Sequence, residues 1–273
     1  MSNRPGCFLL TYLFGMVPDL DSIAALCLKY DVPLVEDISQ ALGARFNGQL
    51  LGTFGDAAIC STSLGKFLDA YNGAFVLCHN PDIFYAISSQ VKSFINPSRK
   101  RLFSIVLKTF CWNFALNLRV FAALTYPFLC FLKAYDLNKF ESLLGPSILP
   151  RGLASSLPSY YFESISNIQV WAMSYYIKRL PLLLSERRML VDRVVEPLFA
   201  SSLRLGPLAS AFCDRRHVYW QYVFPVTRVS SARKILFDHG VETSTTNLPD
   251  LALSCGVNLC NASKLKQHFL YTH

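Results

Sequence analysis

The side chains with the clearest chemical potential gather in one stretch of the chain, residues 33–76. An apolar run there ends in Glu36 and Asp37, and a second apolar run leads into a turn of three hydroxyl residues, one leucine, one glycine and Lys66. Ligands of open α/β sheets bind at the carboxyl ends of strands, and a turn rich in hydroxyl and backbone N–H donors can hold a phosphate. The layout predicts a polar site that holds a cofactor against two strand ends. The alternative is that the acids only cap the structure that follows them and that the lysine is solvated.

The elements that must position these side chains follow a strand–helix–strand pattern. Residues 7–14 are apolar, apolar residues then recur at helical spacing up to Tyr30, and Leu34 begins another apolar run. Short connections of this kind favour a parallel sheet with helices on its faces. Because the first strand begins close to residue 1, we expect either a small sheet or a chain that is a piece of something larger.

Further elements are expected downstream. Asn47-Gly48 indicates a hairpin turn, and residues 57–60 are typical of a short strand. Periodicity and turn residues then predict the following elements: helices over 167–180 and 181–197, a strand over 217–224, a helix over 230–239, and a linker over 145–159. Three arginines of the second of these helices are expected to be solvated: Arg187, Arg188 and Arg193.

The composition is unusual for a chain that contacts only water. Apolar residues make up 52% of it, charged residues only 16%, and the mean hydropathy is +0.31. We therefore expect contact with lipid, with a partner or with a part of the protein outside this chain. Nine cysteines are scattered singly, with no CxxC pair and no histidine at zinc-ligand spacing. They predict reduced thiols in the cytoplasm and no metal site.

Positive charge is concentrated in one apolar region. The net charge is +8, and residues 83–135 contain seven basic residues and no acid. A nucleic-acid-binding protein more often spreads basic residues over a polar face, whereas these lie in the most aromatic part of the chain. The pattern favours an anionic membrane surface over a nucleic acid.

Residues 99–133 are the candidate for that contact. On one continuous helix, four basic residues would form a narrow stripe and two aromatic residues could anchor the helix at lipid headgroups: Arg101, Lys108, Arg119 and Lys133 for the stripe, Trp112 and Tyr126 for the anchors. The longest uncharged run, residues 120–132, has 13 residues, too few to span a bilayer. We therefore expect a helix in the membrane interface, kinked or split at Pro127. The alternative is an apolar insert that packs on the protein or on a dimer partner.

Several motifs occur in the order and at the spacing of a known family. They are LFG at 13–15, PDLDSI at 18–23, VEDISQALGA at 35–44, FGDAA at 54–58, and Ser61 followed five residues later by Lys66. SNIQ at 166–169, residues 219–225 and GVET at 240–243 continue the likeness. In these motifs the chain resembles the DegT/DnrJ/StrS aminotransferases, which depend on pyridoxal phosphate (PLP) and mostly aminate nucleotide-linked keto-sugars.

The resemblance implies roles for four residues. Lys66 would form a Schiff base with PLP and then act as general acid and base, with its pKa lowered by burial and by the cationic ring. Asp37 would pair with the pyridinium nitrogen, so that the ring remains an electron sink. Gln40 would lie near the phenolic oxygen of the cofactor, and Ser61 would bind its phosphate.

The resemblance also implies a fold class and a domain layout. The fold would be α/β, a partial PLP-dependent transferase of the aspartate aminotransferase type (fold type I). Residues 1–95 would form part of the large PLP-binding α/β domain, 96–155 a hydrophobic basic helical insert and linker, and 156–273 an incomplete small C-terminal α+β domain. The family's Gly-Thr phosphate turn, ahead of the first strand, and its last elements have no counterpart here, so we expect a chain truncated at both ends.

The function implied is amino-group transfer by a ping-pong mechanism. An amino acid, with glutamate as the expected donor, would aminate a nucleotide keto-sugar in polysaccharide or glycoconjugate biosynthesis. The protein would be a homodimer in the cytoplasm, peripheral on the cytoplasmic face of the membrane. The alternative is a catalytically inactive fragment or pseudoenzyme that keeps the middle of the fold and binds a membrane or a partner.

Overall fold

The computed structural model describes residues 5–135, 156–195, 217–226, 228–238, 243–245 and 269–272. The chain divides into two compact units. The first comprises residues 1–106, 158–199 and 213–220, and the second comprises residues 107–157, 200–212 and 221–273. Most of the linker expected over 145–159 lies outside the described residues. The domain boundaries expected from the sequence stay a prediction.

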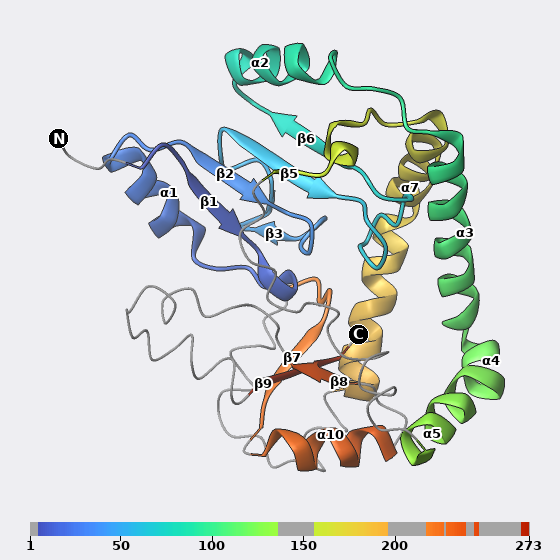
Figure 1. The fold of residues 1–273 in the computed structure, drawn as a ribbon. Helices are drawn as coiled ribbons and strands as arrows, with labels where there is room; N and C mark the ends of the chain where they lie inside the picture. The colour runs from blue at the N-terminus through green and yellow to red at the C-terminus, as the bar shows by residue number, and fades with distance from the viewer. Residues whose placement is uncertain are drawn as a thin grey trace. The chain divides into compact units, whose positions relative to one another are not determined.

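A four-stranded sheet organises the first unit (Figure 1). Its strands lie in the order β1-β2-β5-β6, with β1 at Phe8–Thr11, β2 at Leu34–Asp37, β5 at Ala57–Ser61 and β6 at Ala74–Cys78. β1, β2 and β5 are parallel, and β6 is antiparallel to β5. The predicted parallel strand–helix–strand unit is therefore confirmed, and the carboxyl ends of β2 and β5 lie side by side.

Local sequence signals explain the connections of this sheet. Helix α1, Leu20–Lys29, begins after Asp19, whose carboxylate accepts hydrogen bonds from the backbone N–H and hydroxyl of Ser22. The predicted hairpin is present as β3 (Arg45–Phe46) and β4 (Gln49–Leu50). Its two turn residues, Asn47 and Gly48, both have positive φ, as a two-residue hairpin turn of this type requires.

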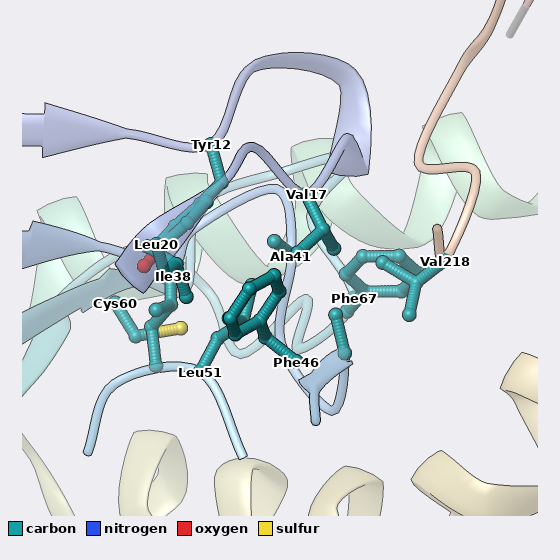
Figure 2. Packing of buried hydrophobic residues seen from close by; sticks show 11 residues of the cluster. Tyr12, Val17, Leu20, Ile38, Ala41, Phe46, Leu51, Cys60, Phe67 and Val218 are labelled. Atoms are coloured by element: carbon teal, nitrogen blue, oxygen red, sulfur yellow. The ribbon is translucent and has the colours of Figure 1, made fainter. Parts of the chain in front are cut away.

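An apolar core packs around the carboxyl ends of the strands, and Figure 2 shows its side chains converging. The core includes residues from β1 to the turn after β5, together with Val218 from far along the chain: Tyr12, Val17, Leu20, Ile38, Ala41, Ala44, Phe46, Leu51, Cys60 and Phe67. Burial of apolar surface is the main favourable term in folding. The core thus fixes the loops that carry the candidate site.

Glu36 is a buried structural acid rather than a solvent-facing cap. It is fully buried and accepts hydrogen bonds from the hydroxyl of Tyr12 (2.6 Å) and from the backbone N–H groups of Gly52, Phe54 and Gly55 (2.7 to 2.8 Å). Burial, together with the hydrogen bond to Glu36 and its charge, raises the pKa of Tyr12. The carboxylate therefore ties β1 and the 52–55 loop to β2.

A long helix, α7, completes the first unit together with α2 (Pro81–Val91) and the short helices η1 (Leu13–Gly15) and η3 (Ser159–Phe162). α7 spans Asn167–Leu190, begins with a capping box between Ser166 and Gln169, and continues into a π-helical turn, η4, at Val191–Val195. The predicted start is confirmed. The predicted division at Pro181 is wrong, because the helix passes through this proline while Leu180, Leu183 and Leu184 pack on the core.

The second unit contains a three-stranded antiparallel sheet, with strands in the order β7-β9-β8. The strands are β7 (Tyr222–Pro225), β8 (Thr243–Thr245) and β9 (Phe269–Thr272), and helix α10 spans Val229–Asp238. The strand predicted over 217–224 begins only at Tyr222. Residues 217–220 instead belong to the first unit.

The helical segment after α2 is bent. Helix α3 spans Arg99–Ala115, and a break follows before α4 (Leu118–Val120), the π-helical turn η2 (Phe121–Thr125) and α5 (Tyr126–Tyr135), as Figure 1 shows. The sequence predicted the kink at Pro127, but it lies at Leu116-Asn117, where the Asn117 side chain accepts a hydrogen bond from the Arg119 N–H. Pro127 lies in the first turn of α5. Among the described residues no single helix is long and apolar enough to cross a bilayer; α3 and residues 118–132, bent by 62°, meet that criterion only together.

Candidate active site

The carboxyl ends of β2 and β5 bring three of the four predicted site residues to one edge of the sheet. Asp37 is the last residue of β2 and Ser61 the last residue of β5, and the two strands are paired, with Asp37 opposite Ile59. Lys66 follows in the turn after β5, close enough for the charge of Asp37 to act on it. The juxtaposition expected from the sequence is therefore present.

Lys66 is half-buried, and its ammonium group faces an aromatic ring. Burial lowers the pKa of Lys66, while the charges of Asp37 and Cys60 oppose that shift. The Lys66 Nζ atom lies 4.2 Å from the ring centroid of Trp220, within the range of a cation–π contact. A lysine in this setting loses its proton, and becomes a nucleophile, at a lower pH than an exposed lysine.

Trp220 is a component of the site that the sequence did not reveal. Besides covering Lys66, its indole N–H donates a hydrogen bond of 2.9 Å to the carbonyl of Gly65. Lys66 and Trp220 are 154 positions apart, and no local pattern of types or spacing links them. Only the tertiary structure brings them together.

Two arginines hold the segment that carries Trp220. Arg187 donates to the backbone carbonyls of Tyr219 and Trp220, and Arg188 donates to the carbonyl of His217 at 2.7 Å. Burial lowers the pKa of Arg187. The prediction that these two arginines are solvated is therefore wrong, because backbone carbonyls from a distant segment recruit them. Arg193 is exposed, as expected.

Close backbone packing fixes the other side of this segment. The Val218 N–H donates to the carbonyl of Gly15, and the N–H of Val17 donates to His217 Nδ1. Gly15 has φ +82°, and a Cβ there would lie 2.9 Å from both the Gln40 carbonyl and the Trp220 nitrogen. Glycine is required at this position both for its backbone conformation and for the close approach.

Side-chain hydrogen bonds orient the remaining polar groups. Asp37 accepts from the Ser39 N–H at 3.0 Å, and the side-chain oxygen of Gln40 accepts from the Phe14 N–H at 2.6 Å. The hydroxyls of Ser61 and Ser63 are 3.1 Å apart. The edge therefore presents a carboxylate, two hydroxyls and a half-buried amine, and the Phe14 N–H holds the amide of Gln40.

The chemical groups of these side chains suit those of PLP. A half-buried amine with a lowered pKa suits an aldehyde carbon, the Ser61 and Ser63 hydroxyls suit a phosphate, and the Asp37 carboxylate suits a protonated ring nitrogen. Trp220 occupies one side of Lys66, so any ligand must reach the amine from another side or displace the indole.

Part of the chain matches a known protein family. Residues 4–117 match the model of the DegT/DnrJ/EryC1/StrS aminotransferase family. Over 71 residues the chain is 35% identical to a pleiotropic regulatory protein of Geobacillus stearothermophilus. This match covers 26% of this chain and 19% of that protein. Over 77 residues it is 34% identical to L-glutamine:2-deoxy-scyllo-inosose aminotransferase of Micromonospora echinospora, covering 28% of this chain and 18% of that protein.

Solved structures resemble the whole chain. The aminotransferase TlmJ from Streptoalloteichus hindustanus matches with a TM-score of 0.64 and 20% identity, covering 100% of this chain and 61% of that one. E. coli GDP-4-keto-6-deoxy-D-mannose-3-dehydratase, solved with bound hydrated PLP, matches with a TM-score of 0.61 and 14% identity, covering 100% of this chain and 64% of that one.

The chain thus shares the α/β fold of an aminotransferase and of an enzyme solved with bound PLP, as the sequence predicted. The resemblance to the DegT/DnrJ/EryC1/StrS family is confirmed, and the family model matches residues 4–117. The matches cover about a fifth of the curated relatives' length, and the chain covers 61% and 64% of the two solved chains.

Proposed function

We propose that this protein is a PLP-dependent sugar aminotransferase in which Lys66 binds the cofactor. The observation that carries the proposal is the placement of Lys66, half-buried and with a lowered pKa, beside Asp37 at the carboxyl edge of β2 and β5. The family match over residues 4–117 supports the same reading, because it includes this edge of the sheet.

Each polar residue of the edge would have a separate task. PLP, when bound, supplies an electron sink for the charge that develops on the substrate carbon. Lys66 would bind the cofactor's aldehyde carbon and, once released, carry the proton to and from the substrate. Asp37 would keep the ring nitrogen protonated. Ser61 would donate to the phosphate.

Gln40 would contact the cofactor through its amide NH₂ group. The Phe14 N–H already holds the side-chain oxygen of Gln40, which leaves the NH₂ as the group that can donate to a phenolic oxygen. This assignment predicts a hydrogen-bond donor, rather than an acceptor, at that side of the cofactor.

The substrates we propose are a nucleotide-linked keto-sugar as acceptor and an amino acid, glutamate, as donor. A relative from Aneurinibacillus thermoaerophilus, 37% identical over 58 residues and covering 21% of this chain and 16% of its own, is a dTDP-3-amino-3,6-dideoxy-alpha-D-galactopyranose transaminase. The Micromonospora relative is named for L-glutamine as donor, so the two amino acids should be compared directly. We place the reaction in polysaccharide or glycoconjugate biosynthesis, in a homodimer at the cytoplasmic face of a membrane.

The absorbance of the purified full chain with added PLP tests the proposal. We expect a new band in the near-visible range that is absent in Lys66→Ala. Lys92→Ala, which removes an exposed lysine after α2, is the matched control and should keep the band. If wild type shows no band, or if Lys66→Ala keeps it, the proposal fails and a non-catalytic role for the fold is favoured.

A further inference from the structure

Helix α3 carries an apolar stripe that faces solvent. Leu107, Phe110 and Phe114 are spaced three and four residues apart, which places them on one face of the helix. Phe110 and Phe114 are 65% and 56% exposed, and their rings stack with centroids 6.4 Å apart. Thr109, which is only 4% exposed, lies roughly on the opposite side, since successive helical residues are about 100° apart.

Helix α5 repeats the arrangement. Phe128, Phe131 and Tyr135 share one face and are 55%, 56% and 78% exposed, whereas Leu129 is 8% exposed and lies on the far side. We call the six exposed residues of the two helices the outer stripe: Leu107, Phe110, Phe114, Phe128, Phe131 and Tyr135. In both helices the apolar stripe therefore faces away from the packed side, the reverse of a helix on a water-facing surface.

The described segment that carries the outer stripe has only positively charged side chains. Lys108 and Arg119 are exposed, and residues 83–135 contain no acid. The four-residue basic stripe expected from the sequence is not formed, because the 62° bend separates Arg119 and Lys133 from α3. Arg101, moreover, pairs with Glu163 at 2.6 Å and lies over the ring of Tyr160, so its charge is already matched.

We propose that the bent pair α3 and α5 binds an anionic lipid surface, with the outer stripe among the acyl chains and Lys108 and Arg119 at the headgroups. Exposed aromatic and aliphatic residues flanked by cations suit such an interface. A second copy of the chain is a poorer occupant, because it would bring like charges together. Neither helix alone reaches the roughly 20 residues of a span, and a 62° bend interrupts the pair, so we infer that they lie in the interface.

Neither of the two headgroup anchors suggested by the sequence lies with the outer stripe. Trp112 is 48% exposed. Tyr126 is half-buried, and its hydroxyl donates to the carbonyl of Phe237 in α10, within the same unit. Trp112 is exposed, but it lies two residues, or about 200° around the helix, from both Phe110 and Phe114 and so points away from the outer stripe.

Flotation of the full chain with lipid vesicles tests the proposal. We expect binding to vesicles of mixed phosphatidylcholine and phosphatidylglycerol, and about fivefold weaker binding for each of Lys108→Gln and Arg119→Gln. The double variant Phe110→Ser/Phe131→Ser removes two residues of the outer stripe and should weaken binding about a hundredfold. Leu28→Ser, at a residue of α1 that is 84% exposed, is the matched control and should bind as wild type does.

Two results would overturn the proposal. One is that wild type fails to float with anionic vesicles at low salt. The other is that Phe110→Ser/Phe131→Ser floats as wild type does but converts a dimer to a monomer in sedimentation velocity, which would assign the outer stripe to a second copy. Far-ultraviolet circular dichroism of each variant checks that it is folded. If the double variant does not fold, Lys108→Gln and Arg119→Gln, which change exposed positions, still test the proposal.

Discussion

Glu36 and Asp37 are neighbours in β2, so their side chains point to opposite faces of the sheet. Glu36 is buried and accepts four hydrogen bonds, three of them from backbone N–H groups of the 52–55 loop. Asp37 instead lies at the strand end, where its charge acts on Lys66. Glu36 therefore has a structural role, and Asp37 remains the proposed site residue of this acidic pair.

Glu36→Gln should destabilise the first unit. The glutamine NH₂ group would face N–H donors that now have a carboxylate acceptor, and buried donors without a partner are costly. We expect the free energy of unfolding to fall by about 3 kcal/mol. Asp82→Asn, at an exposed acid in the first turn of α2, should change it by less than about 0.5 kcal/mol. Urea denaturation measures both, and equal effects would contradict the role given to Glu36.

Because of the buried thiol of Cys60, we expect the free energy of unfolding to fall at alkaline pH. Burial and the charge of Asp37 raise the pKa of this thiol to about 12 from its ordinary 9.0. Because the unfolded chain loses this proton first, the stabilisation is complete below about pH 9 and is lost as the pH rises from 9 to 12.

The matched variant for that prediction is Cys60→Ala. Wild type should lose up to about 1.4 kcal/mol per pH unit more than this variant between pH 9 and 12. Tyr12→Phe removes another group with a raised pKa and serves as the comparison. Parallel pH profiles for wild type and Cys60→Ala would show that the thiol is not protected by burial.

At the scale of elements, α7 positions the site by holding the 217–220 segment. Arg187 and Arg188 bind its carbonyls, and the segment places Trp220 over Lys66. An element packed in this way is set by contacts that are distant in sequence, which explains why periodicity alone predicted solvated arginines and a strand beginning at residue 217.

Trp220→Ala should make Lys66 more reactive. Removing the indole opens one side of the amine, so the rate of labelling of Lys66 by an amine-reactive acylating reagent should rise severalfold. Trp171→Ala, at a tryptophan of α7 that is 64% exposed, should leave that rate unchanged. Mass spectrometry of the labelled peptide gives the rate, and a slower reaction in Trp220→Ala would contradict the covering role.

Pro181→Ala should stabilise α7. Proline within a helix lacks an N–H donor and crowds the preceding turn, at a cost of about 3 kcal/mol relative to alanine. Replacing it also makes the unfolded chain more flexible, which offsets part of the gain in stability. We expect the free energy of unfolding to rise by about 1–2 kcal/mol. Leu182→Ala, next to it and 52% exposed, should change it little. A lower melting temperature for Pro181→Ala would show that the helix needs the proline.

At the scale of the whole molecule, the sequence predicted the parts of the fold that depend on local patterns. The parallel strand–helix–strand unit, the hairpin at Asn47-Gly48 and the start of α7 all follow from alternation, turn residues and capping. The placement of Trp220 and the break at Leu116-Asn117 did not follow. The first depends on contacts distant in sequence, and the second on a single asparagine cap within an otherwise uninterrupted apolar helix.

We propose that PLP binds to Lys66, and reductive trapping tests this assignment directly. The full chain is mixed with PLP, reduced with borohydride, digested and mapped by mass spectrometry at several pH values. We predict one modified lysine per chain, Lys66, with modification reaching half its maximum at a pH below the ordinary pKa of lysine, because burial lowers the pKa of Lys66. Modification spread evenly over exposed lysines such as Lys29 and Lys92, or no modification of Lys66, would contradict the account.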